Sequence, residues 1–181
     1  FRPFDHEMSR WGEVQAFTFP ILGDDYCFTI RNKVLDEAFV KRTKAKYLPY
    51  RSNLPIKFLG AYEPGDNVIV IVEGEKKAIV LKDHGIPAIG IWGVNMFKSE
   101  WMPWTIKRFE RRYVLFDSDN WHVMMAAERL AKDIQGAPIY LKGKPDDLLV
   151  SGQITAEDIR HEMKEANHEF YMPEVPGRSV P

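Results

Sequence analysis

Cysteine is nearly absent from this 181-residue sequence, in which Cys27 is the single example. One cysteine excludes an internal disulfide framework and any zinc site built from several cysteines. No stretch approaches the ~18 consecutive apolar residues of a membrane span. The histidines show no HExxH or other paired spacing, and the GKP segment at 143–145 lacks the first glycine and the Ser or Thr of a Walker loop. These absences exclude a disulfide-stapled protein, a membrane-spanning protein and a P-loop ATPase.

An excess of charge of either sign is also missing, because 25 Lys and Arg stand against 26 Asp and Glu. The balance conceals an uneven distribution. Between Arg31 and Gly60, eight Lys and Arg stand against two acids, a local net charge of +6, and Tyr47 and Tyr50 lie among them. Cations interleaved with aromatic residues suit backbone phosphates and stacked bases. On composition alone, a solvated lysine-rich face is an equally good interpretation.

The remaining composition is that of a globular protein, with 45% hydrophobic and 28% charged residues. No leader of charged and then apolar residues follows Phe1, so we expect no signal peptide and a cytoplasmic location. The last residues, 172–181, contain three prolines and a glycine, which predicts a flexible tail or linker.

From Asn67 onward, strand-like and helix-like segments alternate. Asn67–Val72 is a run too apolar for a half-exposed strand, which predicts a buried strand of a parallel sheet. This alternation predicts an α/β domain with a parallel, Rossmann-like sheet flanked by helices. The expected strands are 67–72, 86–91, 112–117 and 137–141, and the expected helices are 75–84, 120–135 and one that starts near Thr155 with a capping box to Asp158. The first 66 residues carry weaker signals, with strands expected over 26–31 and 46–50.

Acidic residues follow three of the expected strands. Glu73 ends the first, Asp117 and Asp119 end the third, and Asp146 and Asp147 follow the fourth. Because the carboxyl ends of parallel strands lie at one edge of the sheet, we expect these acids to converge. Grouped carboxylates repel one another unless a cation neutralises them, and oxygen ligands suit Mg²⁺ or Mn²⁺. A lone Asp-x-Asp is more often a cap or turn, so the prediction depends on the pattern of three.

The same segments resemble a toprim domain, the catalytic domain of DnaG-type primases, topoisomerases and some nucleases. The resemblance is carried by EGEKKA at 73–78, GIPAIGIWGV at 85–94, VLFDSD at 114–119 and KGKPDDLL at 142–149. It is greatest toward the primases of phages and plasmids. A weaker likeness to the basic segment of primase cores lies upstream, in FTIRN at 28–32, KYL at 46–48 and KFL at 57–59. The resemblance implies a toprim catalytic domain over 67–171 and a smaller basic α+β subdomain over 1–66.

Carried over residue by residue, the resemblance implies roles for the acids. Glu73 matches the toprim glutamate, a catalytic metal ligand or proton-transfer group. Asp117 and Asp119 match the catalytic, metal-binding aspartates. The late acid, also a metal ligand, is Asp146 or Asp147, with Asp146 slightly favoured.

One position departs from the pattern of many toprim primases, which have an aspartate where this sequence has Lys77. The EGE-x-KA subgroup carries the same change. Either Glu75 takes the place of that aspartate or no residue does.

Basic residues are the expected contacts for DNA and nucleotide. Arg31 and Lys46 are the first choices for template or nucleotide phosphates, and lysines that flank the acids are placed to hold a triphosphate: Lys76, Lys77, Lys142 and Lys144.

The resemblance implies a DNA primase, a nucleotidyltransferase that makes short RNA primers on single-stranded DNA from NTPs, with Mg²⁺ or Mn²⁺. Two divalent cations can activate a 3′-hydroxyl and neutralise a leaving pyrophosphate. The same cluster serves phosphodiester hydrolysis, so a metal-dependent toprim nuclease is the first alternative, and a non-catalytic nucleic-acid-binding module is the second. The implied setting is the cytoplasm of a bacterial host cell, with a replicative helicase, fused or separate, as a further partner.

Overall fold

The computed structural model describes residues 16–22, 28–52, 58–97, 106–118 and 120–169 of the chain. The chain divides into two compact units, 1–58 and 59–181. The predicted boundary between residues 66 and 67 falls within the second unit, because the strand β4 (Phe58–Ala61) is part of its sheet. The predicted tail over 172–181 and the position of Cys27 lie outside the described residues.

The first unit is a three-stranded antiparallel sheet with one short helix. Its strands β1 (Ala16–Leu22), β2 (Phe28–Val34) and β3 (Tyr47–Ser52) pair in that order. The helix α1 (Glu37–Thr43) begins after Asp36, whose Oδ1 accepts a hydrogen bond of 2.9 Å from the Phe39 amide. Phe39 packs with Val34 in a small buried cluster. The two predicted strands are confirmed with shifted bounds, whereas the sequence patterns predicted neither β1 nor α1.

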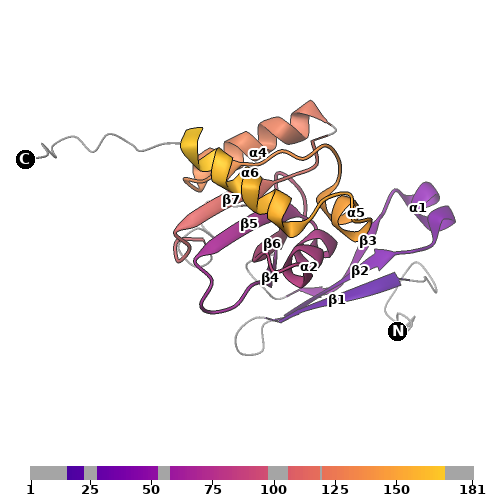
Figure 1. The fold of residues 1–181 in the computed structure, drawn as a ribbon. Coiled ribbons are helices and arrows are strands. Elements are labelled where there is room, and N and C mark those ends of the chain that lie inside the picture. Colours follow the sequence, from indigo (N-terminus) through magenta and orange to yellow (C-terminus); the bar gives the residue numbers. More distant parts are fainter. Residues whose placement is uncertain (1–15, 23–27, 53–57, 98–105, 119, 170–181) are drawn as a thin grey trace, which may run out of the picture. The chain divides into compact units, whose positions relative to one another are not determined.

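The second unit is built on a five-stranded sheet in the order β4-β6-β5-β7-β8 (Figure 1). It places β5 (Val68–Glu73) between β6 (Ala88–Ile91) and β7 (Arg111–Leu115), parallel to both. The strand β8 (Ala137–Pro138) is parallel to β7. The predicted α/β class and parallel sheet are confirmed. The strand expected over 137–141 is shorter than predicted, although the Ile139 amide still donates to the Val114 carbonyl of β7 at 2.9 Å.

Helices flank this sheet, and the apolar run predicted to be a buried strand is buried at residues 69–72. The buried residues of β5 alternate between the two faces of the sheet. Val70 and Val72 belong to one cluster with Ala78 and Leu81 of α2 (Glu75–Asp83). The same cluster takes Leu149 from α5 (Pro145–Val150) and Ile159 from α6 (Ala156–Glu169), while α4 (Trp121–Asp133) packs against β7 and β8. Burial on both faces explains why β5 carries no polar residue before its last position.

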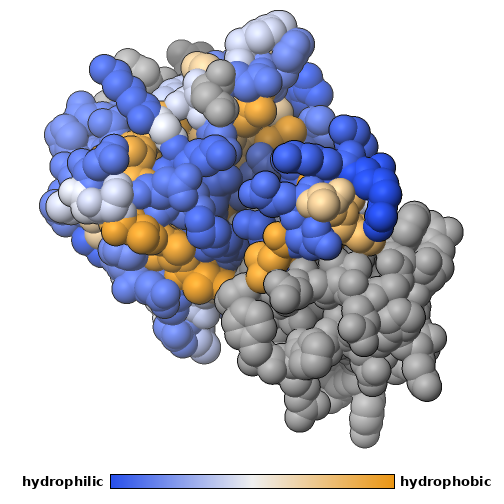
Figure 2. Space-filling view, turned by 90° about the vertical axis from the view of Figure 1, so that its right-hand side faces the viewer, coloured by the Kyte–Doolittle hydropathy of each residue, from blue (hydrophilic) through white to orange (hydrophobic). Residues whose placement is uncertain are grey.

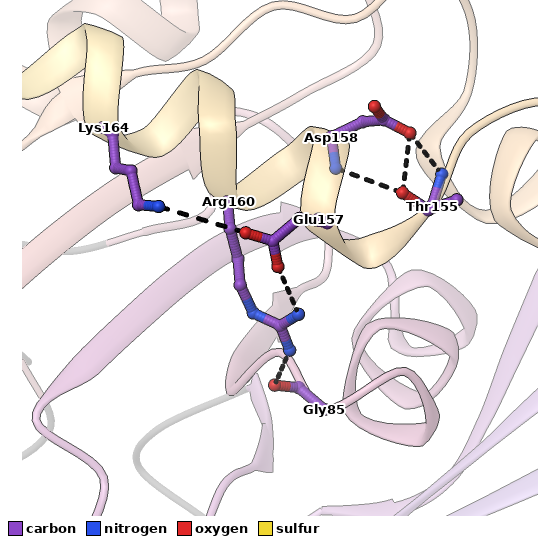
Figure 3. A network of polar contacts seen from close by, with 6 residues as sticks. All are labelled: Gly85, Thr155, Glu157, Asp158, Arg160 and Lys164. Carbon is purple, nitrogen blue, oxygen red and sulfur yellow. Dashed lines mark hydrogen bonds and ion pairs between the residues drawn. The ribbon is translucent and has the colours of Figure 1, made fainter.

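The last helix is fixed at its first turn (Figure 3). Asp158 Oδ2 accepts hydrogen bonds of 2.7 Å from the amide and the hydroxyl of Thr155, and the Asp158 amide donates back to Thr155 Oγ1 at 3.3 Å. The predicted capping box is therefore confirmed. Arg160 donates to the carbonyl of Gly85 at 3.1 Å, which joins α6 to the turn before β6.

The described residues are mostly hydrophilic on the face seen in Figure 2, where hydrophobic residues lie in groups among hydrophilic ones. Within the described ranges, no helix is long and apolar enough to cross a membrane.

Candidate active site

The switch point of the sheet lies at the carboxyl end of β5. After β5 the chain passes through α2 to β6 on one side, and it later returns to β7 on the other side. In parallel α/β sheets, ligands bind where neighbouring connections leave in opposite directions. Glu73 is the last residue of β5, and Val72 is paired with Leu115 of β7, so Glu73 and Phe116 lie at the same level of the sheet. Asp117 is the next residue, at the same edge as Glu73.

A sharp turn at Gly74 leads from Glu73 into α2. Gly74 has a φ of 90°, a conformation that side-chain-bearing residues rarely adopt, and its amide donates to the Ile91 carbonyl at 2.7 Å. Gly90 on β6 makes room for this turn, because a Cβ there would lie 2.6 Å from the Gly74 carbonyl oxygen. Glu75 follows in the first turn of α2 and is completely buried, where a carboxylate is favoured by the helix dipole.

Lys77 and Asp117 form a largely buried ion pair across the switch point. The Lys77 Nζ lies 3.1 Å from both carboxylate oxygens of Asp117 and donates a hydrogen bond to Oδ2. The two side chains are only 13% and 15% exposed. At that burial, water screens the pair weakly, so Lys77 is the main neutralising charge on Asp117.

A second pairing joins α2 to α5. Lys76 Nζ lies 2.8 Å from Asp146 Oδ2 and 3.3 Å from Asp147 Oδ1. Asp146 is buried and Asp147 is exposed, and which of them is the late acid stays a prediction. The segment KPDD thus forms a helix start with Pro145 in its first turn, and both acids lie in that turn.

These contacts shift two pKa values. Burial by itself would raise the pKa of Asp146, but the hydrogen bond and charge of Lys76, together with the charge of Lys77, outweigh it and hold that pKa below its usual value. The hydrogen bond to Asp146 raises the pKa of Lys76, against a smaller opposing effect of burial. Since Lys77 acts on Asp146 as well as on Asp117, the two pairs belong to one electrostatic cluster. We name the five residues Lys76, Lys77, Asp117, Asp146 and Asp147 the lysine–carboxylate cluster.

The loops that carry these acids are also held together directly. Ser118, beside Asp117, donates a hydrogen bond from its hydroxyl to the Leu141 carbonyl. Leu141 lies in the connection from β8 to α5, so this bond ties the Asp117 loop to the segment that leads to Asp146.

The structure leaves some predicted site residues untested. Asp119 lies outside the described residues, and the side chain of Arg31 is not described, although its backbone is paired with Phe19 and Pro49 within the first unit. The remaining predicted phosphate-binding lysines are exposed: Lys46 in the first unit, and Lys142 and Lys144 before α5.

Carboxylate oxygens are ligands of the type that a divalent cation such as Mg²⁺ prefers, although lysines neutralise these carboxylates here. In the described part of the chain, no three Asp, Glu, His or Cys side chains lie together as metal ligands. Asp146 Oδ1 is buried and, among the described residues, has no hydrogen-bond partner. A buried carboxylate oxygen without a donor is one that a hard cation would satisfy. The donor set therefore fits Mg²⁺ or Mn²⁺, and the metal ligands stay a prediction.

Trp121 was not among the predicted site residues. It is the first residue of α4, is 64% exposed, and its ring lies 4.5 Å from that of His122. Asn120 caps this helix by accepting a hydrogen bond of 2.9 Å from the His122 amide. The sequence signal was a large aromatic residue on the polar side of an otherwise amphipathic helix, two residues after the DSD motif at 117–119. Such a ring can stack an unpaired base.

Comparisons with known proteins agree with this architecture. The model of a domain of unknown function, DUF3854, matches residues 64–137, which is less than half of the chain. A search of curated proteins finds no match. Solved structures similar to this chain include the Aquifex aeolicus primase (zinc-binding and RNA polymerase domains), with a TM-score of 0.65 and 18% identity over 82% of this chain and 40% of that one.

Two further structures resemble the chain to a similar degree. A DnaG primase catalytic domain bound to ssDNA has a TM-score of 0.63 and 20% identity over 83% of this chain and 51% of that one. The E. coli primase catalytic core has a TM-score of 0.63 and 19% identity over 83% and 52%. The chain thus spans about half or less of the length of these neighbours. At such identities the likeness concerns the fold: the chain has the α/β, toprim-type fold of DnaG primase catalytic cores.

Proposed function

We propose that the chain is a primase-type nucleotidyltransferase that makes short RNA primers from NTPs on single-stranded DNA. The observation that carries the proposal is the lysine–carboxylate cluster at the switch point of a sheet whose fold is that of primase catalytic cores. A solved neighbour is a DnaG primase catalytic domain bound to ssDNA, which supports single-stranded DNA as the template.

The acids at the sheet edge are assigned to the chemistry. Glu73, Asp117 and Asp119 are the proposed catalytic residues, and with Asp146 and Asp147 they are the proposed ligands of Mg²⁺ or Mn²⁺. When bound, the metal would supply positive charge for the attacking hydroxyl and the leaving pyrophosphate. The protein's own contribution would be carboxylates that follow three strands of one sheet, with lysines paired to those after β7 and β8.

The basic residues are assigned to phosphates. Lys76 and Lys77 already lie at the carboxylates, and Lys142 and Lys144 are exposed just before α5, where a triphosphate beside the acids would meet them. Arg31 and Lys46 are the proposed template contacts of the first unit. If Lys46 binds a phosphate, Lys46→Ala should weaken binding to all single-stranded sequences alike. It should also reduce the slope of log K against log salt concentration by about 1.

The direct test is primer synthesis by the whole chain on a single-stranded template with labelled NTPs and Mg²⁺ or Mn²⁺. Glu73→Gln and Asp117→Asn should each lower the yield by about a hundredfold or more, as loss of a central electrostatic group does in other enzymes. Lys82→Met is the matched control, because Lys82 lies on the same helix and pairs at 2.9 Å with the exposed Glu63.

Two further assays, DNA nicking and DNA binding, would favour the alternatives over primer synthesis. Metal-dependent nicking of DNA that Asp117→Asn abolishes, without polymerisation, would identify a nuclease. DNA binding that neither EDTA nor Glu73→Ala affects, with no turnover of NTPs, would identify a non-catalytic module.

A further inference from the structure

Two adjacent lysines of α2 occupy the carboxylates that the proposed chemistry would need for a cation. Lys77 meets Asp117, which follows β7, and Lys76 meets Asp146 and Asp147, which begin α5. The acids come from two separate connections, and both lysines come from the first turn of one helix. The protein therefore carries its own positive charge at this edge of the sheet.

The position of Lys77 is the one that conflicts with a cation most directly. Its Nζ is equidistant, at 3.1 Å, from the two oxygens of Asp117, which is where a cation bound by that carboxylate would also have to approach. Two positive charges about 4 Å apart repel strongly at the low effective dielectric of a partly buried site. Lys77 and Asp117 are both mostly buried, so solvent screens that repulsion only weakly.

Lys76 is much more exposed to solvent than Lys77. Half of its side chain is exposed, whereas Asp146 is only 6% exposed. Lys76 can move into solvent, and Asp146 cannot follow it. Departure of the lysine would leave a buried carboxylate, one of whose oxygens, Oδ1, already lacks a hydrogen-bond donor among the described residues.

We propose that Lys77 is an internal counter-ion of Asp117 that competes with divalent cations for this carboxylate, and that Lys76 has the same relation to Asp146. The inference deepens the proposed function and rests on it for the presence of a cation at these acids. This competition implies that nucleotide and cation bind cooperatively. The phosphate oxygens of a nucleotide attract the two ammonium groups, so nucleotide binding draws the lysines away and strengthens the hold of the carboxylates on the cation.

The test is the affinity for Mn²⁺ alone, without nucleotide or template, measured on the whole chain by the electron paramagnetic resonance signal of free Mn²⁺. Lys77→Met removes the competing charge and keeps the length of the side chain, and it should bind Mn²⁺ about tenfold more tightly or better, the effect of a 1.4 kcal/mol change. Lys77→Arg keeps the charge and should bind as the wild type does. Lys82→Met, which removes a lysine from the other end of the same helix, should also bind as the wild type does.

Thermal unfolding gives a second readout. Without divalent cation, Lys77→Met leaves Asp117 without its main counter-charge and should melt below the wild type, and Mn²⁺ should raise its melting temperature more than that of the wild type. If Lys77→Met does not fold in EDTA, its recovery on adding Mn²⁺ measures the same competition.

Several results would overturn the inference: Mn²⁺ affinity of Lys77→Met no higher than that of Lys82→Met, no Mn²⁺ binding by any variant, or loss of folding that Mn²⁺ does not restore. Because these measurements use no nucleotide, they are separate from primer synthesis. Tighter Mn²⁺ binding without primer synthesis would reject the proposed function alone, and primer synthesis without tighter Mn²⁺ binding would reject the competition alone.

Discussion

Lys76 and Asp146 form a 2.8 Å ion pair in which half of the lysine side chain is exposed while only 6% of the aspartate side chain is. The partners therefore contribute unequally. The lysine loses little solvation on pairing, whereas the aspartate has exchanged water for this lysine and for the nearby charge of Lys77. The stability of the edge that carries α5 should depend on this contact.

Removing Lys76 should consequently destabilise the second unit. We expect Lys76→Met to lower the free energy of unfolding by about 1–3 kcal/mol, because it leaves a buried charged acceptor without its donor. Urea unfolding at pH 7 in EDTA measures the loss. Lys82→Met, whose partner Glu63 is exposed, should change stability by about 0–1 kcal/mol. Equal losses in the two variants would contradict the unequal roles described above.

Asp146 should also make stability depend on acid pH. Its pKa is lower in the folded protein than in the unfolded chain, so it adds stability above the unfolded pKa of about 3.9, and that stability is lost as pH falls through the folded value. Asp146→Asn removes the titration. The difference in unfolding free energy between wild type and Asp146→Asn should shrink as pH is lowered from about 5, near the upper end of this titration, toward the lower folded pKa. A difference that stays constant over that range would show that Asp146 does not titrate with unfolding.

Trp121 should contribute to binding of single-stranded DNA through base stacking. Stacking of one base on an aromatic ring contributes about 1–3 kcal/mol, so Trp121→Ala should weaken binding about five- to 150-fold, and Trp121→Phe should retain most of the affinity. Fluorescence anisotropy of a labelled oligonucleotide measures both. Met125, which is also exposed on α4 but has no aromatic ring, offers the control Met125→Ala. Similar affinities for Trp121→Ala and Met125→Ala would reject stacking.

Gly90 should be required for the turn that follows Glu73. A methyl group there would lie 2.6 Å from the Gly74 carbonyl oxygen and 3.1 Å from Ala78 Cβ, so Gly90→Ala must displace the start of α2. We expect a loss of about 1–3 kcal/mol in unfolding free energy, which is typical of overpacking, and lower primer synthesis. Gly65→Ala is the control, because nothing lies within 4 Å of a Cβ at that position. Wild-type stability for Gly90→Ala would mean that the turn adjusts freely.

The elements that the sequence predicted well are those with strong local patterns. The β-branched run of β5 and the helix after it were predicted almost to the residue, because burial on both faces leaves no alternative for such a run. The missed elements lack such patterns. β1 contains Pro20, which normally argues against a strand and is tolerated because β1 lies at the edge of its sheet. α1 and α5 are too short for a helical period to be visible.

The candidate site shows the same division. That acids follow β5 and β7 could be predicted from residue order, since parallel strands end at one edge. The sequence could not predict that lysines, rather than another acid, would contact these acids. Lys76 and Asp147 are brought together by the packing of α2 against α5 and not by any spacing along the chain. Nor could the sequence show that Asp146 is buried and Asp147 exposed, because the two are neighbours in the first turn of α5.

The central place of β5 also has a consequence for how the molecule is made. Both neighbours of β5 are added later in the chain, and parallel partners can pair only after the intervening connection has closed. A nascent chain that ends before β7 lacks one of the two strands that pair with β5 beside Glu73. One that ends before α5 lacks Asp146 and Asp147, the ion-pair partners of Lys76. We therefore expect the edge to assemble late in synthesis. Chains truncated before Pro145 should show a broad, weakly cooperative melting transition by circular dichroism where the full chain shows a sharp one.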